Sequence, residues 1–215
     1  MSPLPLADGS GIQMNEQDDR SYCMPRPSVK EDIVVAALKT LHAKGFNGTS
    51  VQDITDAAEV PKGSFYNHFE SKEDLAAVAL DRYWEKAQAS LTLLADEKTP
   101  PVERLKTYFR YLAGIARRGE FRRGCFIGNM ATEMPEHSPV LREKLSTLFA
   151  TWTQAIESCV QEAQANDSLR RDIDAAAIAS FLLNAWEGAL MRSKVDRNAR
   201  SFAAFEEVVF TALAP

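Results

Sequence analysis

The chain has 215 residues, of which 45% are hydrophobic and 26% charged. This is the composition of a globular protein, and it excludes a wholly disordered or collagen-like chain. The formal net charge is −5, with 25 Lys and Arg against 30 Asp and Glu. Charge alone therefore gives no support for a nucleic-acid partner, so a DNA-binding site has to show as a local pattern.

Membrane and secretory segments are not predicted. The longest apolar runs, residues 33–38 and 75–80, are about a third of the length of a membrane-spanning helix. The first thirty residues carry four acidic side chains and no continuous apolar stretch, so we expect a soluble cytoplasmic protein without a signal peptide. Cys23, Cys125 and Cys159 are widely spaced and odd in number, which is typical of reduced thiols. No metal site or cofactor is predicted.

Residues 1–27 contain four prolines and two glycines without helical or strand periodicity. They are predicted to be a disordered tail. Met14 or Met24 could equally be the biological start, a choice that the sequence leaves open. The ordered chain is expected to begin near Ser28.

Capping patterns mark the first predicted helices. A serine followed three residues later by an acidic residue forms a capping box. Three such boxes precede apolar stripes: Ser28 with Glu31, Ser50 with Asp53, and Ser71 with Asp74. The first helix ends at Gly45, where a left-handed backbone is favourable. The second covers about 51–58, the third follows Pro61 over about 62–68, and the fourth runs from 72 to about 94.

The second half of the chain is predicted to be helical as well. Thr99 and Ser138 each stand directly before a proline, a combination that favours a helix start. Asp172 begins an Ala-rich helix that runs to about Lys194, and Asn198 begins the last one. No segment shows the alternating pattern of a β-strand, so the predicted class is all-α.

Residues 51–58 and 62–68 are two short helices joined by a turn, the arrangement of a helix-turn-helix. No acidic residue lies between Glu59 and Glu70, which suits an approach to phosphates. The second helix supplies donors and a glycine that allows close approach: Lys62, Gly63, Ser64, Tyr66, Asn67 and His68. Spacing alone would favour the simpler interpretation, that the two helices merely connect packed elements.

The detail of the motif decides between these interpretations. Phe65-Tyr66-Asn67-His68-Phe69, followed by Ser71-Lys72-Glu73 and Leu75, closely resembles the signature of TetR-family transcriptional repressors, and the match covers about residues 28–80. The resemblance implies that residues 62–68 enter the major groove. It also implies phosphate contacts from a set of residues in and around the motif: Thr49, Ser50, Tyr66, His68 and Lys72.

Two features qualify this resemblance. Phe65 and Phe69 are interpreted as core residues that make the short helix rigid. Glu59 stands in the turn where many family members have glycine, which costs about 1 kcal/mol if the backbone is left-handed there. The predicted organisation is a tail over 1–27, a helix-turn-helix domain over 28–75, and a ligand-binding and dimerisation domain over 76–215.

Aromatic residues are spread over the larger domain, and most are expected to form its core. Buried rings with polar tips need hydrogen-bond partners, so Tyr108, Tyr111 and one tryptophan are candidates for lining a cavity. The family resemblance places an inducer pocket here. The sequence contains no nucleotide-binding loop and no HExxH motif, and its three histidines are scattered, so an enzyme is not predicted.

Cys125 is the most chemically distinctive residue of this domain. Arg122, Arg123 and an expected helix start nearby would all lower the pKa of its thiol and favour the reactive thiolate. A small buried core residue is the equal alternative. Cys159 stands among aliphatic residues and Cys23 in the tail, so neither is the predicted sensor.

Residues 120–194 resemble the TetR subgroup that contains the electrophile sensor NemR and the acrylate-responsive regulator AcuR. The resemblance rests on Gly124-Cys125, residues 141–144, Trp152 and the run from 186 to 194. It implies joint sensing by Cys125 and Lys194, with Asn129, Trp152 and Trp186 as possible ligand contacts.

Together these features predict a repressor that binds operator DNA and is released by a small-molecule inducer. Two alternatives stay open: a purely noncovalent inducer in place of an electrophile at Cys125, and, more weakly, a thiol enzyme. The last two helices are expected to form a homodimer because they carry many apolar groups: Phe181, Leu182, Ala185, Ala189, Phe202, Phe205 and Val209.

Overall fold

The structure is a computed structural model that describes residues 28–215. The predicted tail, Cys23 and the alternative starts Met14 and Met24 lie outside the described residues. The regular elements of the described part are all helical, which confirms the predicted class. In chain order they are α1 (Val29–Lys44), α2 (Val51–Ala57), α3 (Lys62–Tyr66), α4 (Lys72–Gln88), the 3-10 helix η1 (Ala89–Leu93), α5 (Pro101–Arg118), α6 (Phe126–Glu133), α7 (Pro139–Ala165), α8 (Ala175–Asp196) and α9 (Arg200–Ala212).

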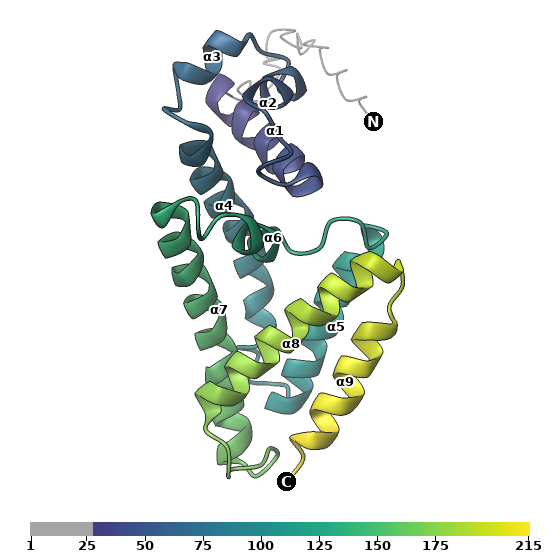
Figure 1. Cartoon of the computed structure of the whole chain (residues 1–215). Coiled ribbons are helices and arrows are strands. Elements are labelled where there is room, and N and C mark those ends of the chain that lie inside the picture. Colours follow the sequence, from purple (N-terminus) through teal and green to yellow (C-terminus); the bar gives the residue numbers. More distant parts are fainter. Residues whose placement is uncertain (1–27) are drawn as a thin grey trace, which may run out of the picture.

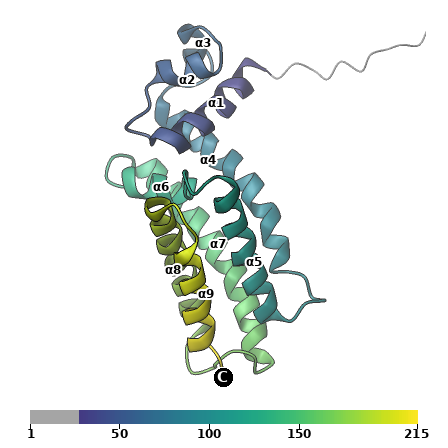
Figure 2. The ribbon, with the colours of Figure 1, turned by 90° about the vertical axis from the view of Figure 1, so that its right-hand side faces the viewer.

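The helices form a small unit and a larger bundle that are connected by α4 (Figures 1 and 2). Helices α1, α2 and α3 pack together at one end, and α4 runs from them into the bundle of α5, α7, α8 and α9. The long α7 packs against α5 and α8, and α8 packs against α9. The short α6 lies at the junction of the two units. Within residues 28–215, no helix has the length and apolar character that crossing a bilayer requires.

The predicted capping serines begin their helices as expected. Each accepts a hydrogen bond from a backbone N–H of the first turn: Ser28, Ser50, Ser71 and Ser138. The box at α2 is reciprocal, because Asp53 N donates to Ser50 Oγ at 3.1 Å and Ser50 N donates to Asp53 Oδ2 at 2.8 Å. Gly45 ends α1 as predicted, with a positive φ of 81° that glycine adopts readily, although its ψ of 168° lies outside the left-handed helical region.

Three other predicted starts are wrong by about one turn or less. Thr99 Oγ1 donates to Asp96 Oδ2 at 2.8 Å instead of capping α5, which begins at Pro101. Asp172 accepts hydrogen bonds from Arg170, and Asp174 is the residue that caps α8. In each case the polar side chain bonds to a loop neighbour, which is the usual competitor of a helix cap. Asn198 likewise accepts from Arg200 N at 3.0 Å, so α9 begins two residues later than predicted.

Two predicted helix ends are also too late. α3 ends at Tyr66, because His68 N and Phe69 N both donate to the carbonyl of Phe65 and the chain turns there. α4 ends at Gln88 and tightens into η1, so the predicted helix over 72–94 is two elements.

Candidate DNA-binding surface and ligand cavity

The turn between α2 and α3 holds its two helices at a fixed angle. Glu59 has a φ of 56°, so this non-glycine residue does adopt the left-handed conformation. Val60 N then donates to Thr55 O at 3.0 Å and closes the turn. Phe65 is fully buried and Phe69 is 3% exposed, which confirms that both rings are core. They hold α3 against the unit with its other face outward.

That outward face carries the predicted recognition residues. Lys62, Gly63, Tyr66, Asn67 and His68 are all exposed, Tyr66 at 59%. Ser64 is half-buried. A Cβ added at Gly63 would have no atom within 4 Å, so the chain's own packing does not require glycine there. The structure therefore brings the predicted groove-reading set together on one free surface at the end of the molecule.

Thr49 and Lys72 face inward, away from that surface. Thr49 is 1% exposed and its Oγ1 donates to Gly45 O at 2.7 Å, so the predicted phosphate contact through this side chain is wrong. Lys72 Nζ donates to the carbonyls of Phe46, at 2.8 Å, and Thr49, at 2.7 Å. Desolvation lowers the pKa of its ammonium. Lys72 thus ties α4 to the loop after α1, a structural role that sequence reasoning missed.

Ser50 remains exposed at the start of α2, on the same unit as the recognition residues. Its hydroxyl and its backbone N–H are both bonded to Asp53 within the capping box. The predicted phosphate contact of Ser50 stays a prediction.

A cavity of about 600 Å³ opens between the small unit and the bundle. Its walls come from α1, α4, α5, α7, α8 and residues 119–125. The inner wall is apolar and aromatic, with Tyr83, Leu112, Trp152, Trp186 and Leu190. The contribution of α1 consists of Val35, Leu38, Lys39 and His42, so an occupant of this cavity would touch the small unit directly.

The predicted ligand residues divide into two groups. Cys125, Trp152 and Trp186 line the cavity, and Lys194 lies beside Gly124 at its edge. Tyr108 is buried behind the wall, where its hydroxyl accepts a hydrogen bond from Trp152 Nε1 at 2.6 Å. It supports the wall and does not line it.

The other two predicted ligand contacts lie away from the cavity wall. Tyr111 is 45% exposed on the outer side of α5, so its assignment to the cavity is wrong. The hydroxyl of an exposed tyrosine can bond to water and needs no buried partner. The position of Tyr111 in the helical repeat of α5 places it on the outer side. Asn129 Nδ2 donates to Arg123 O at 2.8 Å, which holds the segment before α6 in place.

The thiol of Cys125 lies in surroundings opposite to those predicted. Cys125 is the N-cap of α6, as expected, and its Sγ accepts a hydrogen bond from Gly128 N at 3.5 Å. However, Cys125 is only 5% exposed, and burial together with the nearby Glu187 carboxylate raises the pKa of the thiol well above its ordinary value. Arg122 and Arg123 are exposed, and Arg122 pairs with Glu120 at 2.8 Å. The predicted thiolate stabilisation is wrong because burial and Glu187 govern the pKa of the thiol, and neither of the exposed arginines contributes to its shift.

Cys159 is packed as predicted. It is 1% exposed on α7, and its Sγ donates to the carbonyl of Pro101 at 3.3 Å. Burial raises the pKa of this thiol to about 11.

Glu187 is the residue of this region that sequence reasoning missed. Its Oε1 is buried without a hydrogen-bond partner in the described part of the chain, and burial raises the pKa of the carboxyl to about 7. A Cβ at Gly128 would clash with Glu187 Oε2, so α6 and α8 meet closely here. A signal was present, because Glu187 is the sole acidic residue between Asp174 and Asp196 in an apolar helix.

Two hydrogen bonds connect the small unit to the segments around α6. His42 Nε2 of α1 donates to the carbonyl of Gly124 at 3.0 Å, and its ring packs between Tyr83 and Phe126. Burial lowers the pKa of His42, which favours its neutral imidazole. Asn47 N donates to Glu133 Oε2 at 3.0 Å at the other end of α6. Displacement of α6 or of residues 119–125 would therefore act on α1 through bonded contacts.

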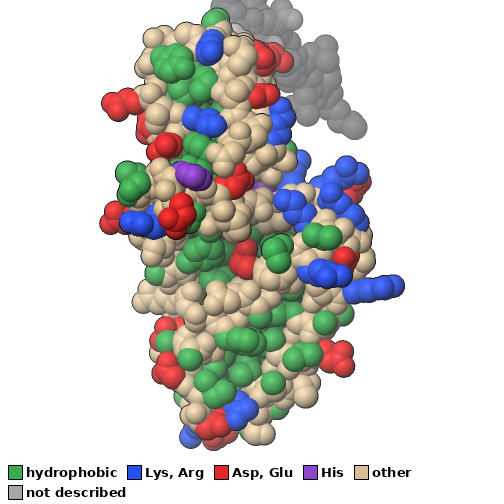
Figure 3. Space-filling model, in the orientation of Figure 1, with side chains coloured by type: hydrophobic (Ala, Val, Ile, Leu, Met, Phe, Trp, Pro, Cys, Tyr) green, Lys and Arg blue, Asp and Glu red, His purple; other side chains and the backbone are tan. Residues whose placement is uncertain are grey.

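The last two helices expose part of the predicted dimer set. Leu182, Phe202, Phe205 and Val209 are buried within the single chain, so these four were wrongly assigned to an intersubunit surface. Phe202 and Phe205 pack on the Trp186 ring, with centroids 4.9 and 5.6 Å away. Phe181 is 57% exposed, and hydrophobic side chains gather along α8 in Figure 3. Other exposed apolar residues of these helices are Met191, Val195 and Val208.

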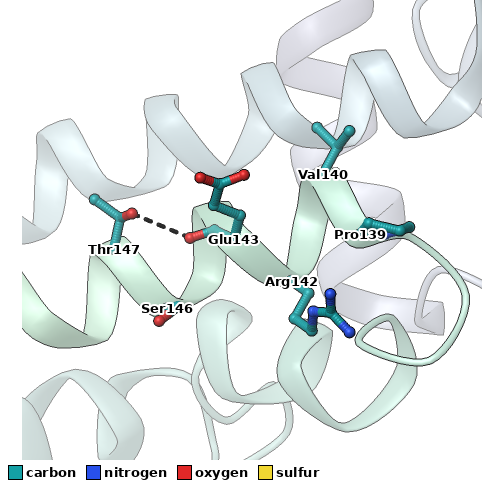
Figure 4. A pocket seen from close by; sticks show the side chains of 6 residues that line it. All are labelled: Pro139, Val140, Arg142, Glu143, Ser146 and Thr147. Atoms are coloured by element: carbon teal, nitrogen blue, oxygen red, sulfur yellow. Dashed lines mark hydrogen bonds between the residues drawn. The ribbon is translucent and has the colours of Figure 1, made fainter.

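A second hollow lies on the outer face of α7 (Figure 4). Its lining comes from a single stretch of helix between Pro139 and Thr147, and Thr147 Oγ1 donates to the carbonyl of Glu143 in the same helix. A hollow built by one helix has no opposing wall to enclose a ligand. The cavity beside Cys125 is therefore the candidate ligand site.

An exposed helix-turn-helix surface joined through α4 to a helical domain with a cavity defines a ligand-regulated DNA-binding protein. Residues 33–79 match the family model described as bacterial regulatory proteins of the tetR family. Residues 101–209 match the model described as a tetracyclin repressor-like C-terminal domain. The chain belongs to the TetR family and is a DNA-binding transcriptional repressor, not an enzyme.

The relatives match between 77% and 89% of the chain. The repressor DhaR of Mycobacterium sp. strain GP1 is 40% identical over 89% of this chain and 96% of its own length. The regulator AcuR of Cereibacter sphaeroides is 36% identical over 77% of this chain and 76% of its own. Escherichia coli NemR is more distant, at 26% identity. The crystal structure of a TetR regulatory protein from Rhodobacter sphaeroides superposes with a TM-score of 0.81 at 30% identity, covering 86% of this chain and 99% of that one.

Proposed function

We propose that this repressor acts in the cytoplasm as a homodimer on a near-palindromic operator and is released by a small molecule that occupies the cavity beside Cys125. The observation that carries the proposal is the shared wall. α1 belongs to the DNA-binding unit and also contributes four residues to the cavity lining. A ligand there changes the position of α1 without any longer relay.

Release follows if the ligand fits the cavity better when α1 has moved. A ligand that bound both arrangements of α1 with equal affinity would not shift the equilibrium between them. The hydrogen bond from His42 to Gly124 O is the contact that such a ligand would disturb, since both residues line the cavity. Breaking it frees α1 relative to residues 119–125. The two recognition helices of a dimer then lose the spacing that a two-half-site operator requires.

Dimerisation is supported by the apolar side chains that α8 and α9 leave exposed. An apolar surface of this kind on two adjacent helices is typical of a subunit interface. Ala185 and Ala189 are half-buried beside Phe181 on α8, and small residues there allow helices of two subunits to approach. Ala185→Glu or Ala189→Glu should give monomers with lost operator affinity, while Ala150→Glu on the exposed side of α7 should not. A dilute parent that sediments as a monomer contradicts the dimer.

The inducer is proposed to bind noncovalently. The buried Cys125 thiol has a raised pKa, which disfavours the attacking thiolate. Attack on an electrophile at Cys125 is the second candidate, because the sulfur belongs to the cavity wall and Lys194 lies nearby. Intact mass and operator release, measured together on the parent and on Cys125→Ser, separate the two. An adduct with release only in the parent would establish the covalent mode.

Selection of bound sequences from random DNA tests the function as a whole. The expected product is a near-palindrome bound by two subunits. The selected operator then serves to screen for compounds that release it. Failure to enrich any sequence from the full-length chain would contradict the proposal.

A further inference from the structure

We propose that the inducer is a small organic anion with an apolar body, held with its anionic head among the basic side chains at the mouth of the cavity. This inference rests on the proposed function, since it takes the cavity to be the inducer site. The lining contains six Lys and Arg residues and no Asp or Glu: Lys39, Arg82, Lys86, Arg118, Arg122 and Arg123.

Composition does not account for this set. Residues 28–215 contain 23 Lys and Arg against 26 Asp and Glu, so an average surface of this protein is slightly acidic. Figure 3 shows basic side chains gathered near the ends of α5 and α8 and the loops that follow them, while both signs are mixed elsewhere on that face. The basic character is therefore local to the cavity region.

Four of the six cations have no carboxylate partner among the described residues. Arg82 binds Glu31 and Glu85, and Arg122 binds Glu120. The cations left without an ion pair in that range are Lys39, Lys86, Arg118 and Arg123. They come from α1, α4, α5 and the 119–125 segment, so separate elements bring them to one opening.

The potential of this cluster reaches into the cavity. Besides burial, the charges of Arg123 and Lys194 lower the pKa of His42, which lies on the α1 wall. A field that disfavours one more positive charge favours a negative one at the same place. An ammonium ligand would be repelled, and a neutral ligand would leave the cations unused.

The remaining walls of the cavity determine the polarity and the size of the rest of the ligand. Leu112, Trp152, Trp186 and Leu190 offer apolar surface behind the basic mouth. A volume of about 600 Å³ suits a compound of modest size. A carboxylate gains strong charge-assisted hydrogen bonds from Arg118 or Arg123, and bidentate pairing with arginine fixes its orientation. The ligand class is therefore a monoanionic acid with an aliphatic or aromatic body.

The test uses matched acids, amides and amines that cannot alkylate a thiol. Straight-chain acids of four to eight carbons and benzoate are each compared with the corresponding amide and amine, by thermal shift and by release of the selected operator. At least one acid is expected to bind about tenfold more tightly than its amide, and the amines should not bind. Arg118→Gln/Arg123→Gln should lose about tenfold in affinity for that acid, whereas Arg142→Gln, in the hollow on α7, should not.

Each other outcome has a defined meaning. If the amides bind as well as the acids, if no acid binds, or if Arg118→Gln/Arg123→Gln keeps its affinity, the anion proposal is wrong. If the same variant instead weakens operator binding in the absence of any acid, the cluster serves DNA phosphates, which also overturns it. An acid that binds to a chain unable to select any DNA would contradict the proposed function and leave the anion site standing.

Discussion

The recognition surface and the cavity mouth differ in how they use charge. Over residues 62–68 the recognition surface has one lysine, Lys62, and the nearby Lys72 is bonded to two backbone carbonyls. The cavity mouth carries six Lys and Arg residues. The surface that meets a polyanion is therefore the less basic of the two. We therefore expect operator contacts to depend largely on neutral donors such as Ser64, Tyr66 and Asn67, with few phosphate charges neutralised.

Charge reversal at Lys62 should have the largest effect. Lys62→Glu places an acid on the surface that otherwise has none between Glu59 and Glu70. Operator affinity is expected to fall about 100-fold or more, because like charges opposed at an interface cost several kcal/mol. Fluorescence anisotropy with the selected operator measures this. Lys98→Glu, on an exposed loop far from α3, changes the net charge equally and should bind normally. Equal loss in both variants would mean that global charge governs binding.

A substitution at Glu187 tests the electrostatics of the buried region beside Cys125. Its folded-state pKa of about 7 exceeds its ordinary value of 4.5, so the folded chain binds more protons than the unfolded chain between these values. The stability contributed by the protonated carboxyl is complete below about pH 4.5 and is lost as the pH rises through 7. Glu187→Gln should therefore gain roughly 1–3 kcal/mol relative to the parent between pH 5 and pH 8. Urea denaturation at both pH values measures the difference, and a constant gap would refute the assignment.

Lys72→Ala separates a structural contact from a phosphate contact. Removing the ammonium leaves the carbonyls of Phe46 and Thr49 unpaired, which should cost about 1–3 kcal/mol of stability. Operator affinity should fall alike for all sequences. The salt dependence of binding decides between the two roles. An unchanged slope supports a purely structural lysine, and a slope smaller by about 1 shows a lost phosphate contact.

The smallest expected effect is at Glu59. Glu59→Gly removes a side chain from a left-handed backbone position and an acid from the edge of the recognition surface. We expect a gain of roughly 0.5–1 kcal/mol in stability and slightly tighter operator binding at low salt. Thermal unfolding and anisotropy measure these. Glu120→Gly, also left-handed but away from the recognition surface, should show the stability gain alone.

Local chemistry made the helix-turn-helix predictable from sequence. A capping box such as Ser50 with Asp53 acts within four residues, and the burial of Phe65 and Phe69 follows from their spacing on one short helix. The inward contacts of Thr49 and Lys72 were missed for a different reason. Their hydrogen-bond partners are backbone carbonyls of a loop, 4 and 26 positions away in the sequence. Hydrophobic periodicity does not reveal whether a polar side chain points to solvent or to the carbonyls of a neighbouring loop.

The cavity was predictable only in part. Cys125, Trp152 and Trp186 were identified, but the wall contributed by α1 was not, because His42 meets Gly124 across 82 positions of sequence. The reactivity predicted for Cys125 used its sequence neighbours, whereas its pKa is set by burial and by Glu187 on another helix. Adjacent arginines in the chain say little about a thiol when their side chains point to solvent.

The position of α1 in both the cavity wall and the DNA-binding unit affects the inducer concentration that is needed for release. In the proposed function the inducer weakens operator binding. Binding free energies are linked reciprocally, so the operator then weakens inducer binding by the same factor. Repressor on DNA therefore responds at a higher inducer concentration than free repressor. Extra operator copies in a cell would raise the threshold for induction, and a dissociation constant measured without DNA would underestimate it.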